Sequence, residues 1–250
     1  MSRNIHFITY GNSKFARAKA RILKEAEEFG EFKTVKGYGP EDLPNDFKEQ
    51  FKQILSQPRI GGYGIWRPMI IKERLDSIND GDFLIYVDAG CTLNPQGKTR
   101  LYEYINALGK SDYGILSFQM TGTHGPGGFH AERLWTTKQI FNYFNINMDS
   151  EMAKNGQYLD TVIIMEKNNH MKKILDIWIK SIYDNALMFT DIYNSDQAPY
   201  FKDNRHEQSV LSLIRKKYGS MVIEGDETWM QPFGQGESLK YPFWATRSKK

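Results

Sequence analysis

One continuous apolar run, Phe83–Val87, constrains most strongly what this chain can fold into. It follows the turn signal NDGD at 79–82 and stops at Asp88-Ala89-Gly90. A short apolar run between turn residues predicts a strand buried on both faces, as in sheets that lie between layers of helices. An aspartate at the carboxyl end of such a strand lies where open α/β sheets bind ligands, and a following glycine lets a ligand approach the backbone. The alternative is an ordinary strand-ending turn, because Asp and Gly are common turn residues.

The amino-terminal segment predicts a strand over 5–10 and a helix over 13–29. Gly11 breaks the strand, Ser13 is a candidate cap for the helix, and Gly30 is a natural stop. A strand, a short turn and a helix are how nucleotide-binding α/β folds begin. Neither a G-x-G-x-x-G fingerprint nor a P-loop motif is present, so neither of these two nucleotide sites is indicated.

The rest of the chain alternates between the same two kinds of element. Period-2 and continuous apolar runs predict strands at 34–38, 113–120 and 162–165. Apolar residues at helical spacing predict helices near 43–54, 68–78, 101–108, 137–144, 167–187 and 204–214. This alternation predicts an α/β fold, and the length fits one domain over residues 1–250.

Composition narrows the class of protein. A hydrophobic fraction of 40% is enough for a packed core, and a formal net charge of +3 is too small for a typical nucleic-acid-binding domain. The single Cys91 excludes an intrachain disulfide and a metal site made of several cysteines. No apolar run approaches the roughly 20 residues of a membrane span, and the first residues do not resemble a signal peptide. We therefore expect a cytoplasmic protein without a transmembrane segment.

Two glycine-rich loops are candidate binding segments. In the first, GGYGIWRP at 61–68, Pro68 suits the first turn of a helix, which places Arg67 at a helix amino terminus where anions bind. The structural alternative is a solvated arginine beside a packed tryptophan. The second, TGTHGPGGF at 121–129, is long enough to be functional or mobile, although its flanking histidines, His124 and His130, are explained equally well as solvated side chains.

A polar cluster begins the helix predicted near 204–214. Asp203 or Asn204 is expected to cap it, which places His206, Glu207 and Gln208 in its first turn. The helix dipole favours an acidic side chain there, and this is the structural explanation for Glu207. A protonated histidine gains nothing at this end of a helix, so the position of His206 points instead to a chemical role.

Four stretches match one family pattern. The longest, GYGIWRPMIIKERLDSINDGDFLIYVDAGCTLN at 62–94, fits Gly-Tyr-aromatic-Trp-Lys/Arg-Pro, a helix, Gly-Asp, and a strand ending Tyr-Leu-Asp-Ala-Gly. ERLWT at 132–136, RHEQS at 205–209 (more often RHDQS) and YPFWATR at 241–247 also match. The chain thereby resembles a group of bacterial and large-virus glycosyltransferases with the GT-A fold. The resemblance implies a mixed, Rossmann-like sheet with helices on both faces and sugar transfer from a nucleotide-diphosphate donor.

The resemblance also implies where the donor binds. The turn at Thr9, Tyr10 and Gly11, continued by Asn12, would receive the base and ribose, and Arg67 would stabilise the diphosphate. Ala89 and Gly90 would lie against the donor as well. A UDP-sugar is the expected donor within this group.

The metal site departs from the usual GT-A signature. Asp88 is the expected ligand of Mn²⁺ or Mg²⁺, since both ions prefer carboxylate oxygens. The signature Asp-x-Asp has lost its second carboxylate, because Gly90 stands in the third position. Either another residue completes the metal shell, with His206 as the candidate by analogy, or the reaction proceeds without tight metal binding.

The resemblance leaves two catalytic schemes open. An inverting enzyme needs a general base for the acceptor hydroxyl, and Glu207 is the expected one, with Glu132 and Asp160 as competitors. A retaining enzyme would instead use Gln208 near the sugar, and the leaving phosphate would take the proton.

Two other function classes compete with the transferase. A sugar nucleotidyltransferase would share the strand-then-aspartate pattern, but it usually carries a basic glycine-rich segment near the amino terminus that is absent here. A carbohydrate-binding module would use exposed aromatics, although most of them are explained as core. For the transferase, the expected partners are a nucleotide sugar and a glycan, lipid-linked or protein-linked acceptor, with peripheral contact to the lipid-linked one, in polysaccharide or glycan biosynthesis.

Overall fold

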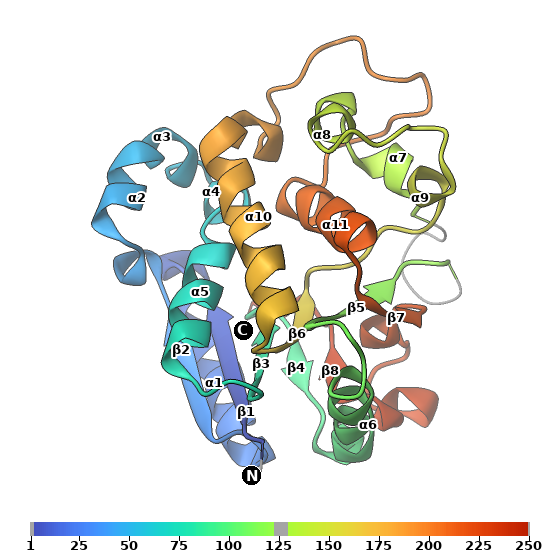
Figure 1. Ribbon diagram of the computed structural model, residues 1–250. Coiled ribbons are helices and arrows are strands. Elements are labelled where there is room, and N and C mark those ends of the chain that lie inside the picture. Colours follow the sequence, from blue (N-terminus) through green and yellow to red (C-terminus); the bar gives the residue numbers. More distant parts are fainter. Residues whose placement is uncertain (1–2, 123–129, 250) are drawn as a thin grey trace.

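A six-stranded mixed sheet runs through the computed structural model, which describes residues 3–122 and 130–249 (Figure 1). In spatial order its strands are β2 (Thr34–Tyr38), β1 (Ile5–Tyr10), β3 (Phe83–Val87), β6 (Val162–Glu166), β5 (Ile115–Gln119) and β7 (Met221–Glu224). The first three are mutually parallel, and β6 runs antiparallel to both of its neighbours. A second sheet pairs β4 (Thr92–Leu93) with β8 (Phe243–Trp244). The predicted mixed α/β sheet is confirmed.

Strand β3 occupies the interior position that its apolar sequence predicts. All five residues are buried, and successive side chains point to opposite faces of the sheet. Leu84 and Tyr86 belong to the core on one face, while Phe83, Ile85 and Val87 belong to the core on the other. Apolar residues at every position of a strand are stable only where helices cover both faces.

Helices cover both faces of this sheet. The cluster around Leu84 and Tyr86 includes residues of α5, α10 and α11, and the opposite cluster includes residues of α1 and α6 (Figure 1). The helices are α1 (Ala16–Phe29), α2 (Asn45–Gln50), α3 (Lys52–Leu55), α4 (Ile60–Tyr63), α5 (Arg67–Ser77), α6 (Lys98–Leu108), α7 (Glu132–Trp135), α8 (Lys138–Tyr143), α9 (Glu151–Lys154), α10 (Asn169–Asn185) and α11 (Glu207–Tyr218). No helix in residues 3–122 and 130–249 combines the length and apolar character needed to cross a membrane.

The ends of the predicted helices differ in detail from the structure. A short 3₁₀ turn, Ser13–Phe15, precedes α1, and the cap is Asn12 rather than Ser13, since the Asn12 side chain accepts from the Lys14 N–H at 3.1 Å. Gly30 ends α1 with φ of +78°, as predicted.

The start of α11 differs more. His206 holds the N-cap position with φ of +57°, whereas Asp203 or Asn204 was expected there. Asn204 instead accepts from the His206 N–H at 3.1 Å and donates to the carbonyls of Met188 and Thr190. Asn204 therefore fixes the loop before α11. Strands β7 and β8 follow that helix, and the sequence analysis did not predict them.

Candidate active site

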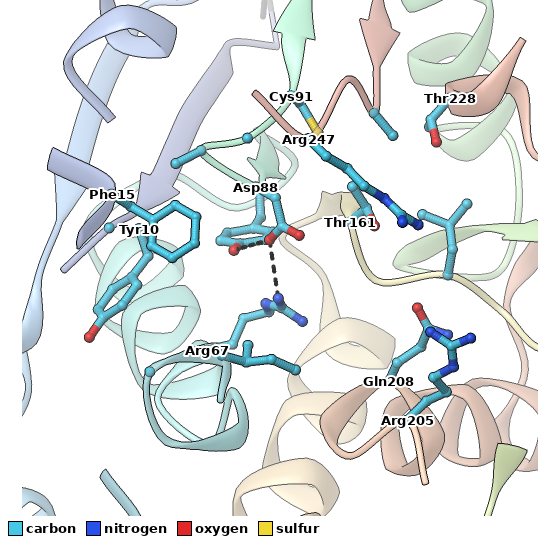
Figure 2. A pocket seen from close by; sticks show the side chains of 18 of the residues that line it. Tyr10, Phe15, Arg67, Asp88, Cys91, Thr161, Arg205, Gln208, Thr228 and Arg247 are labelled. Atoms are coloured by element: carbon cyan, nitrogen blue, oxygen red, sulfur yellow. Dashed lines mark hydrogen bonds and ion pairs between the residues drawn. The ribbon is translucent and has the colours of Figure 1, made fainter. Parts of the chain in front are cut away.

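A pocket of about 760 Å³ opens at the carboxyl ends of β1 and β3 (Figure 2). Its walls come from stretches far apart in the sequence: 10–15 after β1, 58–67 before α5, 88–91 after β3, and residues between 226 and 249. The carboxyl ends of adjacent parallel strands meet at one edge of a sheet, which is where α/β topology places a ligand.

The turn after β1 forms one wall of the pocket. Tyr10 and Gly11, both predicted to contact a donor, line it, and the ring of Tyr10 stacks on Trp66 with 3.6 Å between centroids. Phe15 adds a second aromatic side chain (Figure 2). Thr9, the third predicted contact, is fully buried and does not line the pocket. Thr9 and Tyr10 differ in this way because successive strand residues point to opposite faces, and a contact between Thr9 and a donor stays a prediction.

Asp88 is anchored yet open to the pocket. Its backbone N–H donates to the Thr161 carbonyl at 2.9 Å, and its Oδ1 accepts from the Tyr86 hydroxyl at 2.5 Å and from Arg67 Nη2 at 3.1 Å. The side chain remains 38% exposed. Burial of the surrounding site raises the pKa of Asp88, and the Arg67 charge opposes this rise. Such a carboxylate can accept hydrogen bonds from ligand hydroxyls or bind a cation.

The turn after β3 is covered by the carboxyl-terminal tail. Ala89 and Gly90 both line the pocket. The Gly90 carbonyl accepts from the Ser248 N–H at 2.8 Å and from the Thr246 hydroxyl at 3.0 Å. A Cβ added to Gly90 would lie 3.4 Å from the Cα of Arg247. The close approach that this glycine permits is therefore that of the chain's own tail, whereas ligand approach was expected.

Arg67 lies among three carboxylates. Its Nη1 forms ion pairs with Asp160 and Glu207, and its Nη2 pairs with Asp88. The turn before Arg67 uses Gly64 at φ of +77°, where an added Cβ would lie 3.1 Å from the Glu207 Cβ. Arg67 lines the pocket, but its side chain is only 2% exposed. Three carboxylates already pair with its charge, and a role for Arg67 in binding a diphosphate stays a prediction.

Glu207, the expected general base, lies beneath the pocket rather than in its lining. Its side chain is 2% exposed and does not line the pocket. Burial raises the pKa of Glu207 well above its ordinary value, and the charge of Asp160 adds to the rise. The charge of Arg67 opposes this rise. Glu207 thus pairs with Arg67 away from the pocket lining, and its role as a general base stays a prediction.

Gln208, the next residue, does line the pocket (Figure 2). Its Nε2 donates to Oε1 of the buried Gln157 at 2.6 Å, which fixes the side chain. Adjacent residues of a helix point about 100° apart, so Glu207 and Gln208 face different surroundings. Of the two predicted catalytic residues, the structure brings Gln208 alone to the pocket.

His206 also faces away from the pocket lining. Its ring contacts Tyr63, and its Nε2 lies 3.5 Å from Oδ1 of Asp191. Burial of the imidazole lowers the pKa of His206 to about 4. The predicted metal-ligand pair of Asp88 and His206 is therefore not brought together in the pocket.

Glu132 and Asp160, the two alternative candidates for the general base, are both paired with neighbouring side chains. Glu132 is fully buried, accepts from the Thr136 hydroxyl at 2.6 Å and from Gln157 Nε2 at 2.9 Å, and lies 3.0 Å from Lys216 Nζ. Burial alone would raise the pKa of Asp160, but the charge of Arg67 and the hydrogen bonds to this carboxyl together outweigh burial and lower that pKa. Both carboxylates are thus held in internal networks.

No family model matches the chain, and no curated protein matches it. Solved structures do. A glycosyltransferase involved in the glycosylation of the major capsid of PBCV-1 matches with a TM-score of 0.51 and 14% identity, over 96% of this chain and 93% of that one. Mouse xyloside xylosyltransferase 1 matches with a TM-score of 0.47 and 11% identity, over 90% of this chain and 86% of that one. The first of these, at a TM-score above 0.5, decides the fold. The chain has the GT-A fold.

A GT-A fold raises the question of a divalent metal. The Asp-x-Asp signature would place a second carboxylate at position 90, where Gly90 lies under the tail. Within residues 3–122 and 130–249, no group of three or more His, Cys, Asp or Glu side chains is arranged to hold a metal ion. Oδ1 of Asp88 already accepts two hydrogen bonds. These residues do not fit a preformed metal site, and the requirement for Mn²⁺ or Mg²⁺ stays a prediction.

Several residues lining the GT-A pocket were not proposed as site residues from the sequence. They include Lys14, Thr161, Arg205 and Arg247, and also His130. Most of them lie in the segments that connect helices and strands, where the sequence carries no periodic pattern. His124 and the rest of the glycine-rich loop from residue 123 lie outside the described residues.

Proposed function

We propose that this protein is a glycosyltransferase that moves a sugar from a nucleotide-diphosphate donor, a UDP-sugar, to a carbohydrate acceptor. One observation carries the proposal: a pocket at the strand ends of a GT-A fold holds an anchored and exposed carboxylate, Asp88. This is the position at which a ligand of an α/β sheet meets strand-end side chains. Free glycans and lipid-linked or protein-linked glycans are all candidate acceptors.

The pocket walls suit the parts of such a donor. Tyr10 and Phe15 supply aromatic faces and Gly11 an open backbone beside them, which suits a nucleotide base. Asp88 accepts hydrogen bonds from hydroxyl groups of the donor. Gln208, anchored by Gln157, offers a neutral amide to the sugar or the acceptor.

The reaction forms one bond and breaks one bond at the anomeric carbon. The acceptor oxygen bonds to this carbon as the bond to the β-phosphate oxygen breaks, and the electron pair leaves with the nucleoside diphosphate. The acceptor proton passes to an oxygen of the departing diphosphate. We prefer this route because the neutral Gln208 faces the pocket and Glu207 does not. Catalysis then depends chiefly on positioning the reactants and stabilising the leaving charge.

A thermal-shift screen tests the donor class. UDP, GDP, CDP, dTDP and the matching triphosphates are each added in EDTA and in Mn²⁺, because a ligand that binds only the folded state raises its stability. We expect stabilisation by UDP above the other diphosphates. Stabilisation by triphosphates alone would favour a sugar nucleotidyltransferase, and no shift with any nucleotide would overturn the proposal in favour of a carbohydrate-binding module.

A turnover assay tests the reaction itself. Release of UDP from a panel of UDP-sugars is measured with and without simple sugar acceptors. Slow release without acceptor that increases with one acceptor is the expected result. A protein that binds UDP but releases none from any donor would contradict transfer while leaving nucleotide binding intact.

A further inference from the structure

Two arginines distant in sequence reach into the pocket from opposite sides (Figure 2). Arg205 lies just before α11, and Arg247 lies in the carboxyl-terminal tail. The guanidinium of Arg205 lies over Trp135 at 4.2 Å from the ring centroid, and that of Arg247 lies over Trp229 at 4.7 Å. Stacking on an aromatic face orients a guanidinium while its N–H groups stay available for a ligand.

These two side chains differ from the other arginines around the site. Arg67 is balanced by three carboxylates, and Arg21 donates to the carbonyls of Ala89 and Cys91. Neither Arg205 nor Arg247 forms an ion pair with a carboxylate in the part of the chain that the structure describes. Asp203, the acidic neighbour of Arg205, is instead paired with Arg59 at 3.0 Å. Two exposed positive charges thus line one cavity, and in the described residues neither is ion-paired with a carboxylate.

The backbone holds both arginines in place. The Arg205 N–H donates to the Trp135 carbonyl at 3.0 Å and to Ser209 Oγ at 3.1 Å. Arg247 has φ of +54°, a strained value for a residue with a Cβ, and the next N–H donates to the Gly90 carbonyl. The tail packs closely on position 90, since an added Cβ would already be in van der Waals contact with the Arg247 backbone and a longer side chain would meet it. The tail that presents Arg247 therefore occupies the space beside the lost second carboxylate of Asp-x-Asp.

The positive charges of Arg205 and Arg247 also repel each other. Burial lowers the pKa of Arg205, and the charge of Arg247 lowers it further, partly offset by Asp203 and Asp160. Like charges held around one cavity are relieved when an anion binds between them. Planar guanidinium groups match phosphate oxygens in pairs, and such charge-assisted hydrogen bonds are the strong ones.

We propose that Arg205 and Arg247 form a clamp that binds the diphosphate of the donor and neutralises it as it leaves, without a divalent ion. This inference rests on the proposed transferase function. In the transfer step the electron pair of the broken anomeric carbon–oxygen bond moves onto the β-phosphate, and the two guanidinium groups meet that charge. Glycine at position 90 and a basic tail are then two parts of one arrangement.

Calorimetric titration with inorganic pyrophosphate tests the clamp, because this probe carries no base and no sugar. The full chain is titrated in EDTA and again with Mg²⁺. We expect binding in EDTA, weakened about tenfold or more in Arg205→Gln and in Arg247→Gln, as for loss of hydrogen bonds to a charged group. Arg17→Gln, an exposed arginine of α1 outside the pocket, is the matched control and should bind as the parent does.

Three results would overturn the clamp. They are binding by the parent protein only when Mg²⁺ is present, equal affinity in both pocket variants and the parent, and no binding under either condition. The first needs no variant and so holds even if a variant fails to fold. Nucleotide binding that requires metal would leave the transferase standing and remove the clamp, whereas pyrophosphate binding without any nucleotide binding would do the reverse.

Gly90→Asp tests the role of the tail separately. The added side chain would displace the backbone around Arg247, so metal-free pyrophosphate binding is expected to fall as in Arg247→Gln. Unchanged binding in this variant would overturn the assignment of Arg247, since its position depends on that contact.

Discussion

Arg67 and Glu207 form an ion pair in which each side chain is only 2% exposed, although 140 residues separate them in the sequence. The pair joins the start of α5 to the start of α11 beneath the pocket, and Asp160 also pairs with Arg67. Arg67 and Glu207 are candidate site residues by sequence, and in the structure they join two helices beneath Asp88 and Gln208.

Substitution of Glu207 separates a structural role from a catalytic one. Because burial raises the pKa of Glu207, loss of its charge should cost little, and the amide oxygen of Glu207→Gln can still accept from Arg67. Turnover is expected within about threefold and unfolding free energy within about 1 kcal/mol of the parent. Glu207→Ala should cost about 3 kcal/mol, since it leaves a cavity and a broken network. Urea unfolding and UDP release measure the two effects. Loss of turnover in Glu207→Gln at unchanged stability would restore the general-base role.

Asp88→Asn should remove activity without unfolding the protein. The amide keeps the size of the side chain but loses the charge that meets the donor, so turnover is expected to fall about 100-fold or more. Asp80→Asn is the control, because Asp80 lies in the turn before the same strand with a side chain 92% exposed. A thermal melt checks both folds, and full activity in Asp88→Asn would exclude this carboxylate from the mechanism.

The buried His206 makes stability fall in mild acid. Its folded pKa of about 4 lies below the ordinary 6.5, so the unfolded chain binds the extra proton. The stabilising effect is full above pH 6.5 and is lost as the pH falls toward 4. We expect this residue to account for about 2 kcal/mol of lost unfolding free energy between pH 7.5 and pH 5.

His206→Asn supplies the comparison, because asparagine keeps a polar side chain at this position and does not titrate. Urea unfolding of parent and variant at the two pH values gives the difference. An equal acid-induced loss in both proteins would show that the imidazole is not the group responsible.

Gly64 can be tested against a glycine with the same backbone requirement. Both Gly64 and Gly236 have positive φ, but an added Cβ meets Glu207 at the first and nothing within 4 Å at the second. Gly236→Ala should cost about 1 kcal/mol of backbone strain, and Gly64→Ala about 2 kcal/mol or more. Equal losses in urea unfolding would mean that the contact with Glu207 adds nothing.

Much of the architecture follows from local patterns. Some features depend only on residues a few positions away in the sequence. They are the buried run Phe83–Val87 and the strand and helix before Gly30. The same is true of Asp88, which lies at a strand end by its place in the sequence. The start of α11 was misjudged because Asn204 bonds to carbonyls of a distant loop rather than to its own helix.

The sequence by itself therefore determined the α/β class, the central strand and the aspartate that follows it. Only the tertiary structure decided which polar residues face the pocket. Glu207 and Gln208 are adjacent, and successive residues of a helix point about 100° apart. The packing of α11 therefore buries Glu207 and turns Gln208 toward the pocket. Whether Arg67 or Arg247 is ion-paired likewise depends on carboxylates and backbone groups that lie far away in the sequence. Local patterns specify elements, whereas burial and pairing arise only when those elements meet.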